Sequence, residues 1–256
     1  MKNSPIGVYD SGLGGLSVWR EIRNLLPEES LLYLGDGENC PYGNRSNEEI
    51  REFADRAVER LLDEGCKLIV VACNTATAAA IDFLREKYRG VPIVGMEPAI
   101  KPACLNTVSG VVGVLATSRS LDGELFRHTR SLYGRDVEVI ALEGRGFVEI
   151  VEENREQSPE ARVRVEEVLS QMIERGADQI VLGCTHYPFL KSVIEDVIGD
   201  RAITLIDPSP AIARRVRSLI DEYDIGAERG HKAEYDFITF SNEEYRAKLR
   251  AKALTI

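Results

Sequence analysis

Short runs of Val, Ile and Leu alternate along the chain with longer segments in which apolar residues recur every three or four positions. The runs PIGVYD (5–10), SLLYLGD (30–36) and CKLIVVAC (66–73) have the length and the continuous apolar character of buried strands. Each run is followed by a segment with helical spacing. This alternation predicts an α/β protein with mostly parallel sheets.

Two of the expected helices carry clear start signals. Ser46 and Glu49 have the spacing of a capping box, in which each side chain binds a backbone N–H of the other residue. Ser158 is followed by Pro159, and proline is favoured at the first helical position because its missing N–H is not needed there. Helices are therefore expected to begin just after Ser46 and Ser158.

The alternating pattern pauses near residue 97 and starts again with GVVGVLATS (110–118). The segment LLDEGCKLIVVACNTAT (61–77) aligns with MIERGADQIVLGCTHYP (172–188), and a glycine lies eight residues before a cysteine in both. This repetition predicts two similar α/β domains. The first domain is expected to comprise residues 1–97 plus 210–256, and the second residues 98–209.

Composition narrows the class of protein. The 256 residues include 42 Asp and Glu against 32 Lys and Arg, and the net charge of −10 argues against a nucleic-acid-binding or membrane-surface protein. The chain has neither a signal-peptide pattern nor eighteen consecutive apolar residues, so a cytoplasmic location is expected. Five cysteines without a CxxC pair, and only three histidines, predict reduced thiols and no metal site.

Polar residues gather where the expected strands end. Cys73 and Cys184 each follow a buried strand and precede a helix, whose N-terminus lowers the pKa of a thiol. Each could therefore act as a base or a nucleophile. Asp10 and Ser11 open the loop DSGLGG, which matches neither GxGxxG nor a P-loop. Asp10 would repel a phosphate but suits an ammonium group.

Two further features allow more than one interpretation. The segment CPYGNRS (40–46) can be an ordinary turn covered by Tyr42 or one wall of a binding site. His186 lies two residues after Cys184, where it could donate a proton or adjust the acidity of the thiol.

With these residues assembled, the sequence resembles the glutamate racemases of the cofactor-independent aspartate/glutamate racemase superfamily. Five motifs occur in the order typical of the family: DSGLGG (10–15), CPYG (40–43), ACNTAT (72–77), MEPA (96–99) and GCTHYP (183–188). The resemblance implies two α/β domains facing a cleft, in which L- and D-glutamate are interconverted without a cofactor. It also implies that the D-isomer is supplied to peptidoglycan and that the protein forms a homodimer.

The resemblance further assigns roles to residues of this chain. Cys73 would deprotonate D-glutamate with Asp10 beside it, and Cys184 would deprotonate L-glutamate with His186 beside it. Glu152, in FVEIVEEN, matches a carboxylate of the family's site. The substrate would be held by Asp10, Ser11, Tyr42, Gly43, Asn74, Thr75, Thr117, Thr185 and His186.

The segment ALEGRGFVEI departs from the family, which commonly has Cys-Pro before FV and proline at the position of Glu149. Three alternative functions also remain open. A sibling racemase would act on aspartate or another amino acid, a sugar- or nucleotide-binding module would use DSGLGG for phosphate, and a pyridoxal-phosphate racemase would absorb visible light.

Overall fold

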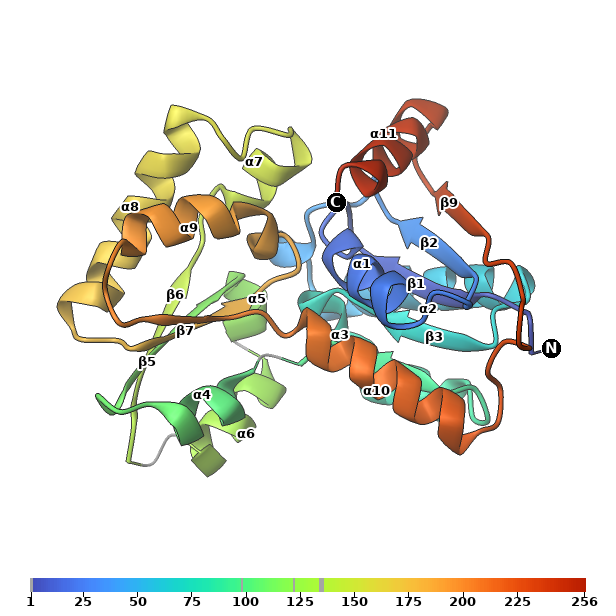
Figure 1. Cartoon of the computed structure of the whole chain (residues 1–256), viewed down its shortest axis with the longest axis horizontal. Coiled ribbons are helices and arrows are strands. Elements are labelled where there is room, and N and C mark those ends of the chain that lie inside the picture. The colour runs from blue at the N-terminus through green and yellow to red at the C-terminus, as the bar shows by residue number, and fades with distance from the viewer. Residues whose placement is uncertain (1, 98, 122, 134–135) are drawn as a thin grey trace. The chain divides into compact units, whose positions relative to one another are not determined.

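The structure is a computed structural model that describes residues 2–97, 99–121, 123–133 and 136–256. The chain forms two compact units, one of residues 1–96 with 209–256 and one of residues 97–208. Both units are layered α/β structures built on a parallel sheet (Figure 1). The fold class predicted from the sequence is confirmed. Pro98 of the MEPA motif lies outside the described residues.

The first unit contains a parallel sheet in the order β4-β3-β1-β2-β9. Its strands are β1 (Ile6–Asp10), β2 (Leu31–Gly35), β3 (Leu68–Val71), β4 (Ile93–Gly95) and β9 (Tyr235–Thr239). Its helices are α1 (Leu16–Leu25), α2 (Asn47–Asp63), α3 (Asn74–Lys87), α10 (Ser209–Glu222) and α11 (Glu243–Leu254), with a 3-10 turn η1 (Tyr42–Asn44). Helices α2 and α3 pack together, and α1 packs with α10.

The second unit contains a parallel sheet in the order β6-β5-β7-β8. Its strands are β5 (Val111–Ala116), β6 (Glu138–Glu143), β7 (Gln179–Gly183) and β8 (Thr204–Ile206). Its helices are α4 (Ile100–Asn106), α5 (Ser118–Leu121), α6 (Glu124–Tyr133), α7 (Phe147–Glu152), α8 (Pro159–Glu174) and α9 (Lys191–Ile198), with a 3-10 turn η2 (Tyr187–Leu190). Helices α8 and α9 lie on one side of this sheet, and α4 and α6 on the other (Figure 1).

The two sheets share one strand order, since β4-β3-β1-β2 corresponds to β8-β7-β5-β6. The turns before β3 and β7 also have the same glycine conformation and equivalent backbone hydrogen bonds. Gly65 and Gly176 have φ of 80° and 82°, a left-handed conformation that glycine adopts without steric cost. The residue after each glycine donates its N–H to the carbonyl of Leu61 or Met172, which is a Schellman-type helix end. The repetition seen in the sequence is thus a repetition of the fold.

A glycine in the first strand of each unit allows the end of a helix to pack closely on the sheet. A Cβ on Gly7 would lie 3.1 Å from Leu61 Cδ1, and a Cβ on Gly113 would lie 2.5 Å from Met172 Sδ. Leu61 and Met172 occupy equivalent positions at the ends of α2 and α8. Both glycines are therefore needed for close packing of helix on strand.

The helix starts predicted from the sequence are confirmed. Ser46 and Glu49 form the reciprocal capping box at the start of α2. Ser158 accepts the N–H of Ala161 at 3.1 Å, and Pro159 is the first residue of α8.

A buried ion pair joins the loops at the amino ends of the first unit's strands. Lys67 Nζ lies 2.6 Å from Glu29 Oε2, and the two side chains are only 5% and 6% exposed. Lys67 also donates to the carbonyl of Lys2, and Glu29 Oε1 accepts the N–H of Ala227 at 2.7 Å. The pair therefore fastens the N-terminal segment and the loop before β9 to the sheet.

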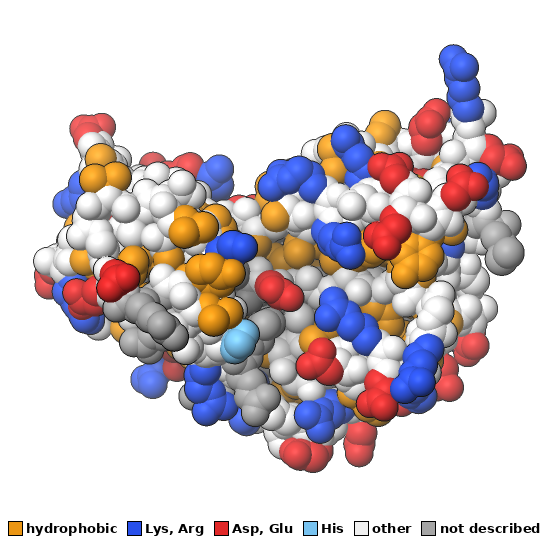
Figure 2. All heavy atoms as spheres, turned by 90° about the horizontal axis from the view of Figure 1, so that it is seen from below, with side chains coloured by type: hydrophobic (Ala, Val, Ile, Leu, Met, Phe, Trp, Pro, Cys, Tyr) orange, Lys and Arg blue, Asp and Glu red, His pale blue; other side chains and the backbone are white. Residues whose placement is uncertain are grey.

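Charged side chains of both signs are mixed over the face of the molecule seen in Figure 2. Within the described part of the chain, no helix has the length and apolar character required to cross a bilayer.

Candidate active site

Cys73 lies between β3 and α3, where its thiol meets the start of the helix. It is the N-cap residue of α3, and its Sγ accepts the N–H of Ala76 at 3.4 Å. Ser11 Oγ lies 3.6 Å from the same sulfur. A thiolate in this position is stabilised by a backbone N–H, a hydroxyl and the positive end of the helix dipole.

The loop DSGLGG places Ser11 beside this thiol. Asp10, the last residue of β1, is completely buried and accepts the N–H of Gly12 at 2.9 Å through Oδ2. The carbonyl of Gly12 accepts the hydroxyl of Tyr33 at 2.7 Å. Gly15 lies against both, since a Cβ there would be 2.5 Å from Asp10 Cβ and 2.9 Å from the Tyr33 hydroxyl.

Asn74 follows Cys73 and carries a buried amide. Its side chain is 4% exposed, and among the described residues neither its oxygen nor its nitrogen has a hydrogen-bond partner. Buried amide groups of proteins are nearly always paired, because an unpaired polar group loses its hydration without compensation. This amide can donate to a ligand carboxylate or accept from an ammonium group. Thr75, the next residue, is also 4% exposed.

Tyr42 and Gly43 belong to the turn η1, which follows the carboxyl end of β2. The Tyr42 hydroxyl donates to Asp36 Oδ2 at 2.6 Å and lies 2.6 Å from the Tyr9 hydroxyl, so a chain of hydrogen bonds runs from Tyr9 to Asp36. Asn39 donates to both carboxylate oxygens of Asp36. The hydroxyl of Tyr42 is thus used to hold the CPYG turn.

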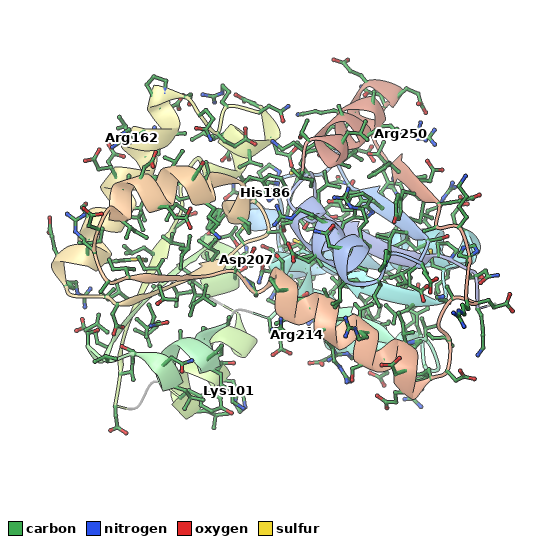
Figure 3. The ribbon with its side chains drawn as sticks, viewed as in Figure 1. Lys101, Arg162, His186, Asp207, Arg214 and Arg250 are labelled. Carbon is green, nitrogen blue, oxygen red and sulfur yellow. The ribbon has the colours of Figure 1, made fainter. Side chains whose placement is uncertain are left out.

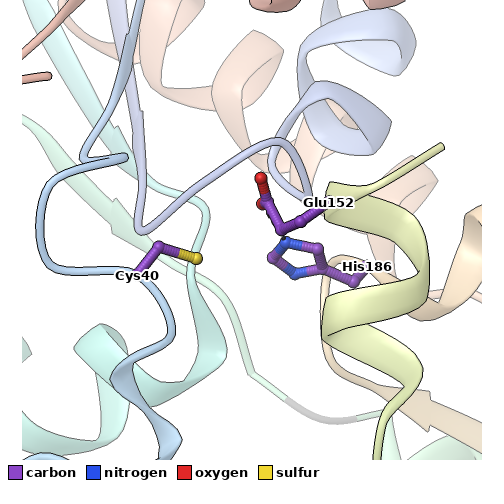
Figure 4. Close-up of side chains that lie close together, drawn as sticks. All are labelled: Cys40, Glu152 and His186. Carbon is purple, nitrogen blue, oxygen red and sulfur yellow. Dashed lines mark hydrogen bonds and ion pairs between the residues drawn. The ribbon is translucent and has the colours of Figure 1, made fainter. Parts of the chain in front are cut away.

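The second unit presents an equivalent thiol with different neighbours. Cys184 follows β7 directly, and its Sγ lies 3.8 Å from Nδ1 of His186. His186 is labelled in Figure 3. The other ring nitrogen, Nε2, lies 2.7 Å from Oε1 of Glu152, the last residue of α7 (Figure 4). One imidazole therefore connects a thiol with a carboxylate.

The surroundings of His186 favour its protonated form. Burial lowers the pKa of this imidazole, but the contacts with Cys184 and Glu152 outweigh burial and raise the pKa well above its ordinary value. Protonation of His186 therefore stabilises the folded protein. This stabilisation is fully present at pH values below the pKa of an unfolded histidine, about 6.5. This contribution is lost as the pH rises through the higher pKa of the folded protein.

We expect the imidazole C2-proton signal of His186 to titrate with a midpoint above that of free histidine. NMR spectra recorded across the pH range measure this midpoint, and His186→Gln identifies the signal among the three histidines. In Glu152→Gln the midpoint falls, because a neutral amide stabilises the imidazolium less than a carboxylate does. A midpoint at or below the free-histidine value in the unaltered protein would contradict the expectation.

Two threonines also stand at strand ends in the second unit. Thr117 follows β5, accepts the N–H of Ser120 at 3.3 Å and donates to the Ser120 hydroxyl at 2.9 Å. Thr185, between Cys184 and His186, is 1% exposed. The site residues thus form two clusters at carboxyl ends of strands, one in each unit. In the first unit these are Asp10, Ser11, Tyr42, Gly43, Cys73, Asn74 and Thr75, and in the second Thr117, Glu152, Cys184, Thr185 and His186.

The segment ALEGRGFVEI forms a tight turn into α7 of the second unit. Tyr187 donates to the carbonyl of Gly144 at 3.4 Å, and a Cβ on Gly144 would lie 2.7 Å from the Tyr187 hydroxyl. Gly146 has φ 79° at the start of α7. Two glycines therefore form the tight turn into the helix that carries Glu152. The exposed Arg145 side chain pairs with Glu143 and lines a pocket of about 440 Å³ beside α8.

Tyr9, Tyr33 and Asp36 were not recognised from the sequence, although each touches a motif that was. The sequence pattern indicates Tyr9 and Tyr33 only as core residues of strands, and Asp36 only as the last residue of SLLYLGD. The available signal was a hydroxyl or carboxylate inside a run of otherwise apolar strand residues, because such groups need a buried partner.

Comparison with known proteins decides the family. A family model described as Asp/Glu/Hydantoin racemase matches residues 9–216. The chain belongs to this racemase family. The enzyme is therefore an isomerase. This racemase is 45% identical over 250 residues to the glutamate racemase of Herpetosiphon aurantiacus, with 98% of both chains covered.

Solved structures of glutamate racemases resemble this racemase over its whole length. An isoform from Bacillus anthracis superposes with a TM-score of 0.87 at 31% identity, covering 100% of this chain and 96% of that one. The enzyme of Francisella tularensis, solved in complex with D-glutamate, superposes with a TM-score of 0.85 at 29% identity, covering 100% and 95%.

Proposed function

We propose that this racemase interconverts L- and D-glutamate by proton transfer between two thiols and the α-carbon of the substrate. The observation that carries the proposal is the repeated thiol, since Cys73 and Cys184 stand at the carboxyl ends of the equivalent strands β3 and β7. Inversion requires one proton to leave and another to arrive on the opposite face of the α-carbon. Two equivalent domains, each with a thiol, are suited to this chemistry if they close on the substrate from opposite sides.

In the proposed direction from D to L, the Cys73 thiolate removes the α-proton and the Cys184 thiol delivers its proton to the other face. Cys73 then holds the proton and Cys184 is the thiolate, and the reverse reaction uses the same residues with their roles exchanged. Ser11 and the Ala76 N–H support the first thiolate, since they contact its sulfur. Protonated His186 supports the second, held in place by Glu152.

The remaining site residues are proposed to hold the substrate. The amide of Asn74, which no described residue pairs, is suited to a carboxylate, and Thr75, Thr117 and Thr185 add hydroxyl groups after the strands β3, β5 and β7. Asp10 is suited to the substrate ammonium by charge. Tyr42 and Gly43 would contribute through their backbone, because the Tyr42 hydroxyl is engaged by Asp36 and Tyr9.

The relatives support a biological role as well. We propose that the product D-glutamate enters peptidoglycan and that the enzyme is a homodimer, as expected from the family resemblance. Light scattering coupled to size-exclusion chromatography would test the dimer directly.

The function is tested by following the α-proton of glutamate by NMR in D₂O, with circular dichroism recorded in parallel. Starting from either isomer, we expect loss of the α-proton signal together with decay of optical activity to zero, without added pyridoxal phosphate or metal. Exchange and decay with aspartate but not with glutamate would favour a sibling racemase. Absence of both changes with both amino acids would contradict racemisation of these substrates.

A further inference from the structure

A buried hydroxyl from a neighbouring strand bonds to the backbone of the DSGLGG loop. Tyr33 lies in β2, is completely buried, and donates to the carbonyl of Gly12 at 2.7 Å. The N–H of the same residue, Gly12, donates to Asp10 at 2.9 Å. Both polar groups of Gly12 are therefore fixed by side chains from two adjacent strands.

The space around these contacts leaves little room for adjustment. The Tyr33 ring packs against Phe237 of β9, with ring centroids 6.2 Å apart. Gly15 also lies close to these groups, because a Cβ at this position would collide with Asp10 and with the Tyr33 hydroxyl. A phenylalanine would fill the place of the Tyr33 ring equally well. The hydroxyl is thus explained by its bond to the loop rather than by packing.

The fixed segment adjoins the reacting thiol. Ser11 precedes Gly12, and its hydroxyl lies 3.6 Å from Cys73 Sγ. Without the Tyr33 bond the Gly12 carbonyl would be free to turn, and Gly12 is the residue that follows Ser11 and donates its N–H to Asp10. Displacements of about 1 Å near reacting groups can reduce a rate by about a hundredfold.

We propose that Tyr33 is a positioning residue for proton transfer at Cys73. It acts through Gly12 to set the place of Ser11 and Asp10, and it does not touch the substrate itself. This inference rests on the proposed two-thiol racemisation of glutamate.

The test compares Tyr33→Phe with Tyr88→Phe. Tyr88 donates its hydroxyl to Asp55 at 2.7 Å and follows the last residue of α3, at the opposite end of that helix from Cys73. In Tyr33→Phe we expect kcat to fall about tenfold or more while KM changes little, because the loop is displaced at the reacting thiol. Tyr88→Phe should retain the activity of the unaltered enzyme. All assays are run at a temperature at which circular dichroism shows every variant to be folded.

Isotope effects distinguish positioning from a general loss of structure. Slowing proton transfer at Cys73 makes that step rate-limiting. In the reaction of D-glutamate, this same step removes deuterium from the α-carbon. The isotope effect on D-glutamate should therefore rise above the isotope effect on L-glutamate in Tyr33→Phe. Equal isotope effects, a larger effect on L-glutamate, or kcat within twofold of Tyr88→Phe would overturn the inference. Failure of the unaltered enzyme to racemise glutamate would instead refute the proposed function.

Discussion

Replacing either Cys73 or Cys184 by Ser is expected to lower kcat for glutamate racemisation by about a thousandfold or more. General acid–base groups contribute factors of about 10² to 10⁴. A serine hydroxyl is a much weaker acid than a thiol, so it provides almost no anionic base near neutral pH. Loss of either thiol should slow both directions, because each direction needs one group to remove the proton and one to deliver it. Circular dichroism at saturating substrate measures the loss.

Cys66 supplies the matched control for this experiment. It lies just before β3, while Cys73 lies just after it, and both side chains are buried. Burial and the nearby Glu64 raise the pKa of the Cys66 thiol to about 12, so it remains protonated at neutral pH. Cys66→Ser should keep the activity of the unaltered enzyme. Near-normal turnover in Cys73→Ser or Cys184→Ser would refute the two-thiol mechanism.

The second large effect is expected from Lys67→Met, which should reduce the free energy of unfolding of the first unit by about 3–5 kcal/mol. Removal of one member of a buried ion pair leaves the other charge without compensation, and such changes cost about this amount. Here the carboxylate of Glu29 would remain buried beside an apolar side chain. Urea unfolding followed by tryptophan fluorescence measures the loss, because the single tryptophan, Trp19, lies in α1 of the same unit.

A second substitution separates the pair from its surroundings. In Lys67→Met combined with Glu29→Gln, most of the lost stability should return, since the uncompensated charge is gone. The exposed pair Arg60–Glu64 provides the control, and Arg60→Met should change stability by about 0–1 kcal/mol. An equal loss of unfolding free energy in Lys67→Met and Arg60→Met would show that the buried pair contributes no more to stability than the exposed pair.

The sequence was sufficient for β1, β2 and β3, for the helix starts after Ser46 and Ser158 and for the repeated fold, because each depends on neighbours close along the chain. The capping box of Ser46 and Glu49 spans one helical turn, and the glycine–cysteine spacing repeats within one strand and its preceding turn. Both patterns are local, so both can be read directly from residue order.

Contacts between distant residues could not be read in this way. Tyr33 and Gly12 are separated by 21 positions, and Tyr42 and Tyr9 by 33. The strand pattern assigns Tyr9 and Tyr33 to buried positions, and CPYGNRS places Tyr42 in a loop, but neither pattern says which group each hydroxyl contacts. The family resemblance indicated His186 and Glu152 as site residues, but it did not predict their contact with each other across 34 positions.

The two thiols stand at equivalent strand ends but have unlike companions, a hydroxyl and a backbone N–H for Cys73 and an imidazole for Cys184. L- and D-glutamate have equal free energies in water, so this asymmetry cannot favour one enantiomer at equilibrium. The ratio of kcat/KM in the two directions is fixed at one. Sequence changes in either half can therefore alter which enantiomer the enzyme holds more tightly and which proton transfer is slower, while the racemic end point stays the same.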